Sequence, residues 1–195
     1  MFANQYDFDD PVSYKMAIGT DMGIRNAIID LQGNVLLYAQ TGGMIAPHRW
    51  PLQQGSKLFR FAGRGSDPQS AAKGGWWIAR DQFEKLLSFA NVHDIGIGVA
   101  VRYLCLLPPE WSDLSHLIKC DVRKPILAWR GLGNTIITPR TGGGLVNMPH
   151  QNEIAERRIH QLFIPGTADM GSDILAIEQD YSIDPKASLR GWLYL

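Results

Sequence analysis

Apolar residues recur at intervals of three and four along one stretch near the middle of the chain, which predicts an amphipathic helix. The residues that share its apolar face are Phe83, Leu86, Leu87 and Ala90. Asp81 precedes Glu84 by three residues, the spacing of a capping box, in which each side chain accepts a hydrogen bond from a main-chain amide at the helix start. We therefore predict a helix that begins near Asp81.

Most other apolar runs are short, rich in β-branched and aromatic residues, and bounded by glycine or proline, which predicts strands. Residues 25–40 contain two such runs around Gly33 and Asn34, whose tolerance of positive φ suits a hairpin turn. Further strands are expected at 58–62, 76–79, 124–131, 133–138, 158–164, 174–178 and 192–195.

The segments between these strands are less regular. Glycines and prolines predict loops or connections over 41–55, 63–75 and 139–149. Residues 94–107 fit a strand, because apolar and small residues alternate, or a helix that begins near Val99. Residues 111–118 are expected to form a short helix.

Many short strands with one or two packed helices indicate an α+β fold with a mixed, mainly antiparallel sheet. A chain of 195 residues most simply forms a single domain, residues 1–195. Residues 1–20 are expected to form an N-terminal arm. Its candidate anchors onto the body of the domain are Tyr6, Phe8 and Tyr14.

Composition restricts the function classes. The 19 Lys and Arg balance 19 Asp and Glu, which argues against a broad nucleic-acid or anionic-membrane surface but allows a local patch. Two cysteines do not make a disulfide framework, and no apolar run approaches the roughly 18 residues of a membrane-spanning helix. The first residues lack the pattern of a secretory signal peptide. We expect a cytoplasmic protein, and delivery into another cell by a specialised secretion system would leave no sign in this pattern.

Arg60 lies in the apolar run Leu58-Phe59-Arg60-Phe61 and is the first candidate for ligand binding. Alternation along a strand puts it on the face of Leu58, opposite Phe59 and Phe61. A charged side chain on an apolar face needs a carboxylate, a phosphate or a cleft, and Arg suits a bidentate grip on phosphate or carboxylate. Two interpretations stay open: a ligand-binding arginine, or an edge-strand arginine that is solvated or forms a structural ion pair.

The next strand contains Trp76 and Trp77, which must face opposite sides. One is expected in the core, and the other is a candidate stacking wall for an aromatic ligand. The connection before them, 63–75, matches neither the P-loop nor the G-x-G-x-x-G fingerprint. It is therefore a surface loop or a lid near a ligand.

Two further regions carry candidate polar residues. Glu153 lies at a loop-to-strand junction, where it can orient a substrate hydroxyl, and Gln151 can engage a target group; the alternative is a solvated loop carboxylate. His116 and Cys120 are four residues apart and would share a helix face, but two ligands do not make a zinc site. No metal is expected.

The order of these features resembles that of bacterial ADP-ribosyltransferases of the arginine–serine–glutamate type, over residues 58–164. The resemblance implies an ADP-ribosyltransferase-like fold, with residues 58–164 as the NAD-binding core. It implies NAD as substrate, phosphate binding by Arg60, and catalysis by Arg60 with Glu153 and Gln151. Other positions that it assigns to NAD are Phe61, Gly75, Trp76, Trp77 and Thr135.

The sequence departs from this family in one strand. The family's Ser-Thr-Ser strand is missing, and Thr135 and Thr138 are its nearest substitutes. Gln161 is an alternative occupant of the glutamate position, in which case the catalytic glutamate is absent and the chain is a pseudoenzyme or a different NAD-consuming fold.

Two functions follow from these features. The resemblance implies NAD-dependent ADP-ribosyl transfer to an unidentified protein or other macromolecule, or NAD hydrolysis, by a toxin or effector. The alternative is a non-catalytic interaction module, such as an immunity, adaptor or phage-encoded protein, that uses the Arg60, Trp76 and Trp77 surface. A transferase needs Arg60, a tryptophan and a carboxylate in one cleft, whereas an interaction module presents them on an open face.

Overall fold

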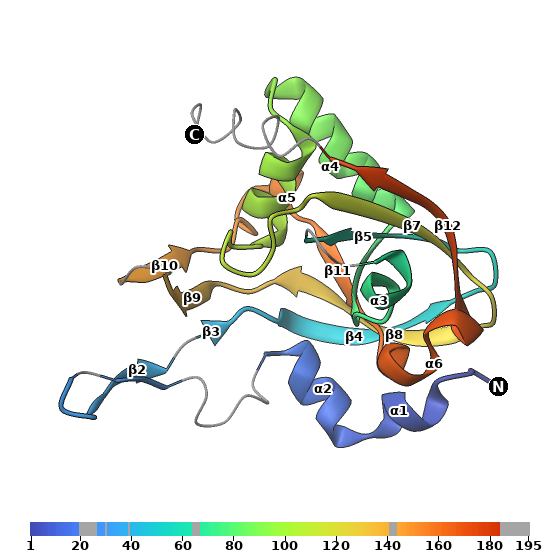
Figure 1. The fold of residues 1–195 in the computed structure, drawn as a ribbon, viewed down its shortest axis with the longest axis horizontal. Helices are drawn as coiled ribbons and strands as arrows, with labels where there is room; N and C mark the ends of the chain where they lie inside the picture. Colours follow the sequence, from blue (N-terminus) through green and yellow to red (C-terminus); the bar gives the residue numbers. More distant parts are fainter. Residues whose placement is uncertain (20–26, 30, 39, 64–66, 141–143, 184–195) are drawn as a thin grey trace.

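In the computed structural model, the central element of the fold is a seven-stranded antiparallel sheet (Figure 1). Its strands follow the order β12-β7-β5-β6-β11-β8-β4. They are β4 (Met44–Leu52), β5 (Lys57–Ala62), β6 (Trp76–Ala79), β7 (His116–Val122), β8 (Ile126–Gly133), β11 (His160–Phe163) and β12 (Leu175–Ser182). The structure describes residues 1–19, 27–29, 31–38, 40–63, 67–140 and 144–183.

Helices cover both faces of this sheet (Figure 1). The longest, α4 (Arg80–Val92), packs with α5 (Ile97–Cys105) on one face. The short helices α3 (Pro68–Ala72) and α6 (Thr167–Ile174) lie on the other. The α+β class with a mainly antiparallel sheet is thus confirmed.

The remaining elements lie around the main sheet. Two helices of the N-terminal arm, α1 (Gln5–Asp9) and α2 (Pro11–Ala17), contact β8 and β4 respectively. Two small sheets pair β1 (Ala27–Ile29) with β2 (Val35–Tyr38), and β9 (Ile136–Pro139) with both β3 (Gln40–Thr41) and β10 (Leu145–Met148). A 3-10 turn covers Ala155–Arg157.

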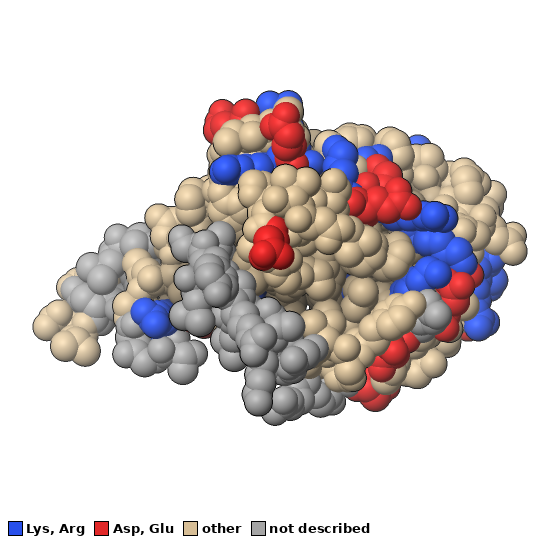
Figure 2. Space-filling model, turned by 90° about the horizontal axis from the view of Figure 1, so that it is seen from above, with Lys and Arg blue, Asp and Glu red and all other residues tan. Residues whose placement is uncertain are grey.

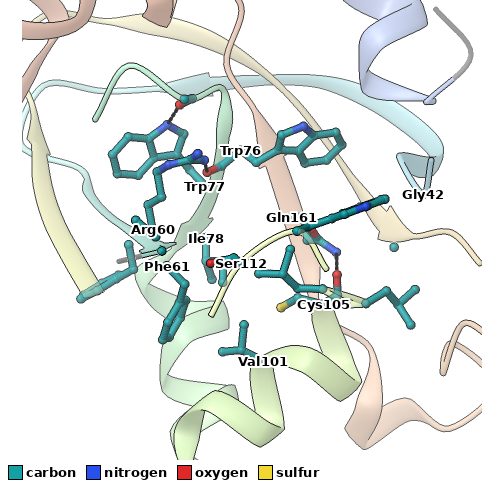
Figure 3. Close-up of a pocket in the computed structure, with 18 of the residues that line it drawn as sticks. Gly42, Arg60, Phe61, Trp76, Trp77, Ile78, Val101, Cys105, Ser112 and Gln161 are labelled. Carbon is teal, nitrogen blue, oxygen red and sulfur yellow. Dashed lines mark hydrogen bonds between the residues drawn. The ribbon is translucent and has the colours of Figure 1, made fainter. Parts of the chain in front are cut away.

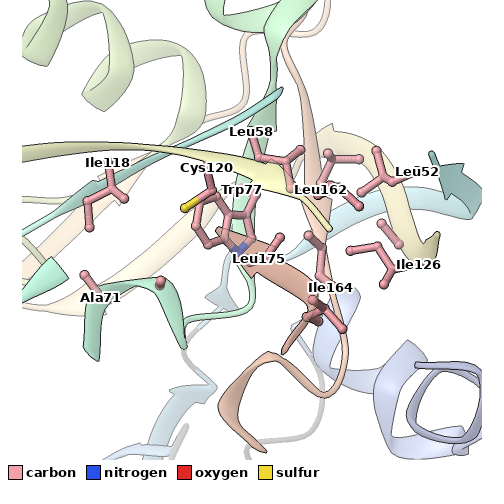
Figure 4. Packing of buried hydrophobic residues seen from close by; sticks show 14 of the residues in the cluster. Leu52, Leu58, Ala71, Trp77, Ile118, Cys120, Ile126, Leu162, Ile164 and Leu175 are labelled. Carbon is pink, nitrogen blue, oxygen red and sulfur yellow. The ribbon is translucent and has the colours of Figure 1, made fainter. Parts of the chain in front are cut away.

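Alternation along β5 divides the interior into two hydrophobic clusters. Leu58 joins the cluster on the side of α3 and α6, together with Trp77 and Leu162 (Figure 4). Phe59 and Phe61 join the cluster under α4 and α5. The predicted orientation of the β5 side chains is therefore confirmed, and Arg60 lies on the Leu58 side of the strand.

The predicted central helix is confirmed, but the predicted capping box is wrong. α4 begins at Arg80 with Ala79 as N-cap, and no side chain caps its first turn. Asp81 pairs with Arg130 and Glu84 with Arg80, so neither makes the capping box. On the apolar face, Phe83, Leu86 and Ala90 are buried, whereas Leu87 is exposed.

Residues 94–107 form a helix rather than a strand, and α5 starts after Gly96. The predicted helix at 111–118 is wrong, because β7 begins at His116. Its buried positions are Ile118, Cys120 and Val122, a period of two that indicates a strand.

Three predicted loops contain regular structure, and one of them, 139–149, includes β10. Residues 41–55 include the edge strand β4, which tolerates Pro47 and Pro51 because an edge strand has neighbours on one side only. Residues 63–75 include α3, where Asp67 accepts a hydrogen bond from the Ser70 amide and Pro68 takes the first helical position. The predicted strand at 192–195 lies outside the described residues.

Hydrogen bonds and aromatic contacts attach the N-terminal arm to β8. Asn4 is fully buried; its amide nitrogen donates to the carbonyls of Leu127 and Pro165, and its oxygen accepts from the Leu127 amide. Phe8 stacks on Trp129 with ring centroids 4.4 Å apart. Of the other candidate anchors, Tyr14 packs edge-on against Trp129, whereas Tyr6 is exposed and anchors nothing in the described structure.

The face of the molecule drawn in Figure 2 carries charges of both signs. Figure 2 shows Lys and Arg next to Asp and Glu rather than one large area of a single sign. Lys57, for example, pairs with Asp121 and Glu178. No described helix has the length and apolar character needed to cross a membrane.

Candidate functional site

A cleft opens where β5 and β6 part. The two strands pair only at Leu58 with Ala79 and at Phe59 with Ile78, whereas β5 continues along β7 to Ala62. Beyond Phe59, β5 and β6 line a cleft of about 410 Å³ (Figure 3). The end of α5, the loop after it, Asn134 after β8, and Gln161 of β11 also line it, together with residues of α3, of β9 and of the segment before β4.

Arg60 brings a positive charge into this cleft. Its Nη1 donates to the carbonyl of Trp76 at 2.7 Å, and its Nε is buried without a hydrogen-bond partner in the described chain. Burial lowers the pKa of Arg60, and no described carboxylate pairs with it. An arginine keeps its proton even so, so the cleft holds a cation that an anionic ligand can pair with.

The two tryptophans divide as alternation requires. Trp77 is 1% exposed within the cluster of Figure 4, and its Nε1 donates to the Gly74 carbonyl at 2.7 Å. Trp76 is half-buried and packs on Phe163, with ring centroids 5.3 Å apart. The expectation of one core tryptophan and one less buried is confirmed, and Trp77 contributes to the cleft lining although it is almost fully buried.

Gln161 projects into the cleft from β11. Its Nε2 donates to the carbonyl of Cys105, at the end of α5, at 3.0 Å (Figure 3). Since a carbonyl only accepts, this bond orients the amide. Oε1 accepts no hydrogen bond from another described residue, so it is available at the cleft as an acceptor. Gly133 makes room for the amide, because a Cβ added there would lie 2.9 Å from Nε2.

The other residues that the sequence assigned to catalysis do not meet Arg60. Glu153 is exposed and does not line the cleft. Gln151 accepts hydrogen bonds from the Tyr103 hydroxyl at 2.6 Å and from Arg157 at 3.1 Å, so it ties the loop before β11 to α5. Both follow β10, and this loop packs beside α5 rather than over β5.

Only some of the other residues assigned to NAD binding line the cleft. Phe61 and Trp76 line the cleft with Arg60. Gly75 does not line it and lies against the Phe163 ring. Thr135 also lies outside the lining, where its hydroxyl accepts from the His150 amide at 3.2 Å.

Several lining residues were missed from the sequence. They come from the connection between α5 and β7 and from the turn after β8: Leu106, Leu107, Trp111, Ser112 and Asn134. No local pattern identifies them, because they reach the cleft through the packing of distant elements. Among the described residues that line the cleft there is no Asp, Glu or His.

The candidate metal pair lies on one face of β7, but four residues of extended strand separate His116 from Cys120 by about 13 Å. Cys120 is buried in the core, and burial raises the pKa of its thiol to about 12. His116 instead pairs with Asp180 at 3.3 Å. No cluster of three or more potential metal ligands occurs in the part of the chain that the structure describes.

No protein family profile matches the chain, and no curated protein does. A chain in the solved structure of Rhs1-CT in complex with cognate immunity protein RhsI1 is similar over 74% of this chain and 86% of its own, with a TM-score of 0.43 and 15% identity. A chain in the structure of Tne2 in complex with Tni2 is similar over 75% of this chain and 98% of its own, with a TM-score of 0.39 and 14% identity. Similarity this distant assigns no activity.

Proposed function

We propose that this protein binds NAD in the cleft between β5 and β6 and hydrolyses the bond between nicotinamide and ribose. The observation that carries the proposal is Arg60: a part-buried cation at a cleft, without a carboxylate partner among the described residues. A diphosphate supplies the missing negative charge, and guanidinium suits its geometry. The cleft volume of about 410 Å³ lies within the range of small-molecule sites.

The reaction needs charge stabilisation more than a nucleophilic side chain. Water adds to C1′ of the ribose while the C1′–N bond breaks, and the bonding electrons neutralise the nicotinamide ring nitrogen. The proton of the water is released, so the products are nicotinamide, ADP-ribose and a proton. Positive charge develops on the ribose in the transition state, and a fixed dipole with its negative end towards C1′ lowers the barrier.

Gln161 is the residue we assign to that task. The hydrogen bond from its Nε2 to the Cys105 carbonyl orients the amide and leaves Oε1 as the negative end of a held dipole at the cleft. Oε1 can also accept a hydrogen bond from a ribose hydroxyl. Phe61 and Trp76 supply the apolar surface against which a nicotinamide ring packs.

The lining favours hydrolysis over transfer to a macromolecule. A transferase has to activate or orient an acceptor, and in the described lining no carboxylate or imidazole is present for that purpose. Arg60 and Trp76 lie in a concave cleft and Trp77 lies in the core, so the geometry does not favour an open binding surface built from them. Because every cell requires NAD, such a hydrolase would act as a toxin or effector wherever it is active.

The test is nicotinamide release from NAD by the purified protein. We expect release by the wild type and by Glu153→Ala, whose side chain lies outside the cleft, and a loss of about 100-fold or more in Gln161→Ala, the size typical of removing one transition-state hydrogen-bonding group. Arg60→Lys should weaken binding of NAD and of ADP-ribose alike. Absence of release by the folded wild type, with no binding of ADP-ribose, would rule out the proposal. Loss of activity in Glu153→Ala would restore the glutamate mechanism.

A further inference from the structure

α5 ends in a strained conformation beside the cleft. Its C-cap, Leu106, has φ 55° and ψ 52°, the left-handed region that residues other than glycine rarely adopt. Leu106 is buried, and Cys105 before it provides the carbonyl that binds Gln161. Strain of this kind persists only where the surroundings impose it. The orientation of the Gln161 amide therefore depends on a fixed conformation at the end of α5.

Arg102 holds this turn. It lies within the last turn of α5, is 4% exposed, and spans two main-chain carbonyls: Nη1 donates to Leu107 at 3.1 Å and Nη2 to Ser112 at 2.7 Å. The Leu107 amide donates in turn to the Arg102 carbonyl at 3.1 Å. The side chain and the main chain of one residue thus close the turn around Leu106.

Arg102 differs from Arg60 in how its charge is balanced. Burial lowers the pKa of Arg102, while the charges of Asp113 and Glu110 act in the opposite direction. Arg102 does not line the cleft, whereas Leu107 and Ser112, which it binds, do. A charge compensated within the protein and turned towards main-chain carbonyls is suited to holding structure, and only the arginine fork reaches both carbonyls at once.

We propose that Arg102 is a positioning residue for Gln161: its fork across Leu107 and Ser112 places the Cys105 carbonyl, and with it the Gln161 amide. This inference rests on the proposed NAD hydrolysis. Because Arg102 lies outside the cleft lining, its replacement should change turnover more than binding of the diphosphate. Lysine keeps the charge and can reach one carbonyl but not both, so Arg102→Lys is the decisive variant.

The experiment compares wild type, Arg102→Lys and the control Arg80→Lys, whose arginine is exposed on α4 and pairs with Glu84. For each we would measure kcat for nicotinamide release, the dissociation constant of ADP-ribose by calorimetry, and the rate at which N-ethylmaleimide labels Cys105. Peptide mass spectrometry separates Cys105 from Cys120, which is buried and serves as an internal reference. We expect Arg102→Lys to lose about 10- to 100-fold in kcat, the cost of a displacement of about 1 Å. Its ADP-ribose affinity should stay within about twofold of wild type, and Cys105 should be labelled several times faster.

Other outcomes separate the two proposals. Wild-type kcat and Cys105 labelling in a folded Arg102→Lys protein would overturn the positioning role, as would equal losses in turnover and ADP-ribose affinity. If the wild type releases no nicotinamide, the proposed function fails, and an unchanged labelling rate in Arg102→Lys still overturns the inference. Should Arg102→Lys not fold, Ser112→Ala loosens the other end, because the Ser112 hydroxyl accepts from the Leu114 amide at 3.1 Å. Faster Cys105 labelling there supports the role, and an unchanged rate overturns it.

Discussion

The guanidinium of Arg60 occupies the space that a side chain at Gly74 would fill. A Cβ added to Gly74 would overlap the guanidinium carbon and Nη2, and would lie 2.7 Å from Nη1. The absence of a side chain at this position lets Arg60 reach the Trp76 carbonyl. Because the guanidinium is the far end of a flexible side chain, an added methyl group would displace it at little cost to the fold.

Gly74→Ala is therefore expected to reduce ligand binding without unfolding the protein. The displaced Arg60 loses its place in the cleft, and ADP-ribose affinity should fall by about tenfold, or roughly 1.4 kcal/mol. Calorimetry measures this loss, and a thermal melt should shift by only a few degrees. Lys73→Ala, at the exposed neighbouring position, is the matched control. Unchanged affinity in Gly74→Ala would contradict the assignment of Arg60 to the diphosphate.

Gly133→Ala is expected to lower kcat rather than ligand affinity, the reverse of the effect of Gly74→Ala. Its Cβ would lie 2.9 Å from Nε2 of Gln161 and 3.3 Å from Cδ1 of Leu106, so the amide must move while Arg60 stays in place. We predict a fall in kcat of about tenfold or more with ADP-ribose affinity nearly unchanged. Steady-state kinetics of the two glycine variants side by side would reveal this contrast. The same change in both would show that neither residue has a separate role.

Cys105 provides a probe of occupancy that does not depend on catalysis. It lines the cleft, and burial raises the pKa of its thiol to about 12, so labelling of the free protein should be slow. Saturating ADP-ribose is expected to slow labelling of Cys105 further and to leave Cys120 unchanged, as measured by peptide mass spectrometry. Equal rates with and without ADP-ribose would place the ligand elsewhere.

Asn4 should be among the more costly polar residues to replace. It is fully buried and satisfies main-chain groups of Leu127 and Pro165. Asn4→Ala leaves those groups unpaired in the interior, so we expect a loss of about 3 kcal/mol in the free energy of unfolding. Urea denaturation measures it, with Tyr6→Ala as the control, because Tyr6 is exposed on the same arm. A loss below about 1 kcal/mol would show that the arm contributes little to stability.

Protonation of His160 is expected to lower the stability of the folded protein in mild acid. Burial, with a contribution from the positive charge of Arg130, lowers the pKa of His160 below 6.5. The unfolded chain then takes up the proton first, so this contribution to stability is complete above about pH 6.5 and declines as the pH falls towards the lower pKa of the folded state. We predict that His160→Gln loses less melting temperature than wild type between pH 7.5 and 5.5. His93→Gln, at the exposed end of α4, should follow the wild-type profile.

The features that could be predicted from sequence are those set by neighbours along the chain. Alternation in β5 placed Arg60 on the Leu58 face, and intervals of three and four residues located α4, because both periods follow from local backbone geometry. The same local rules failed at β4, where Pro47 and Pro51 signalled a loop. Only the position of β4 at the sheet edge makes prolines acceptable there.

The cleft depends on contacts between residues far apart in sequence, and only the tertiary structure decided its composition. Gln161 meets the Cys105 carbonyl across 56 positions, and β6 pairs on one side with β5 and on the other with β11, which is far away in sequence. No local pattern specifies which strands become neighbours, because the free energy of that choice comes from packing the whole sheet between its two hydrophobic clusters. Arg60 was therefore identifiable as a candidate from its own strand, whereas its convergence with Gln161, and the exclusion of Glu153 from the cleft lining, followed from the fold.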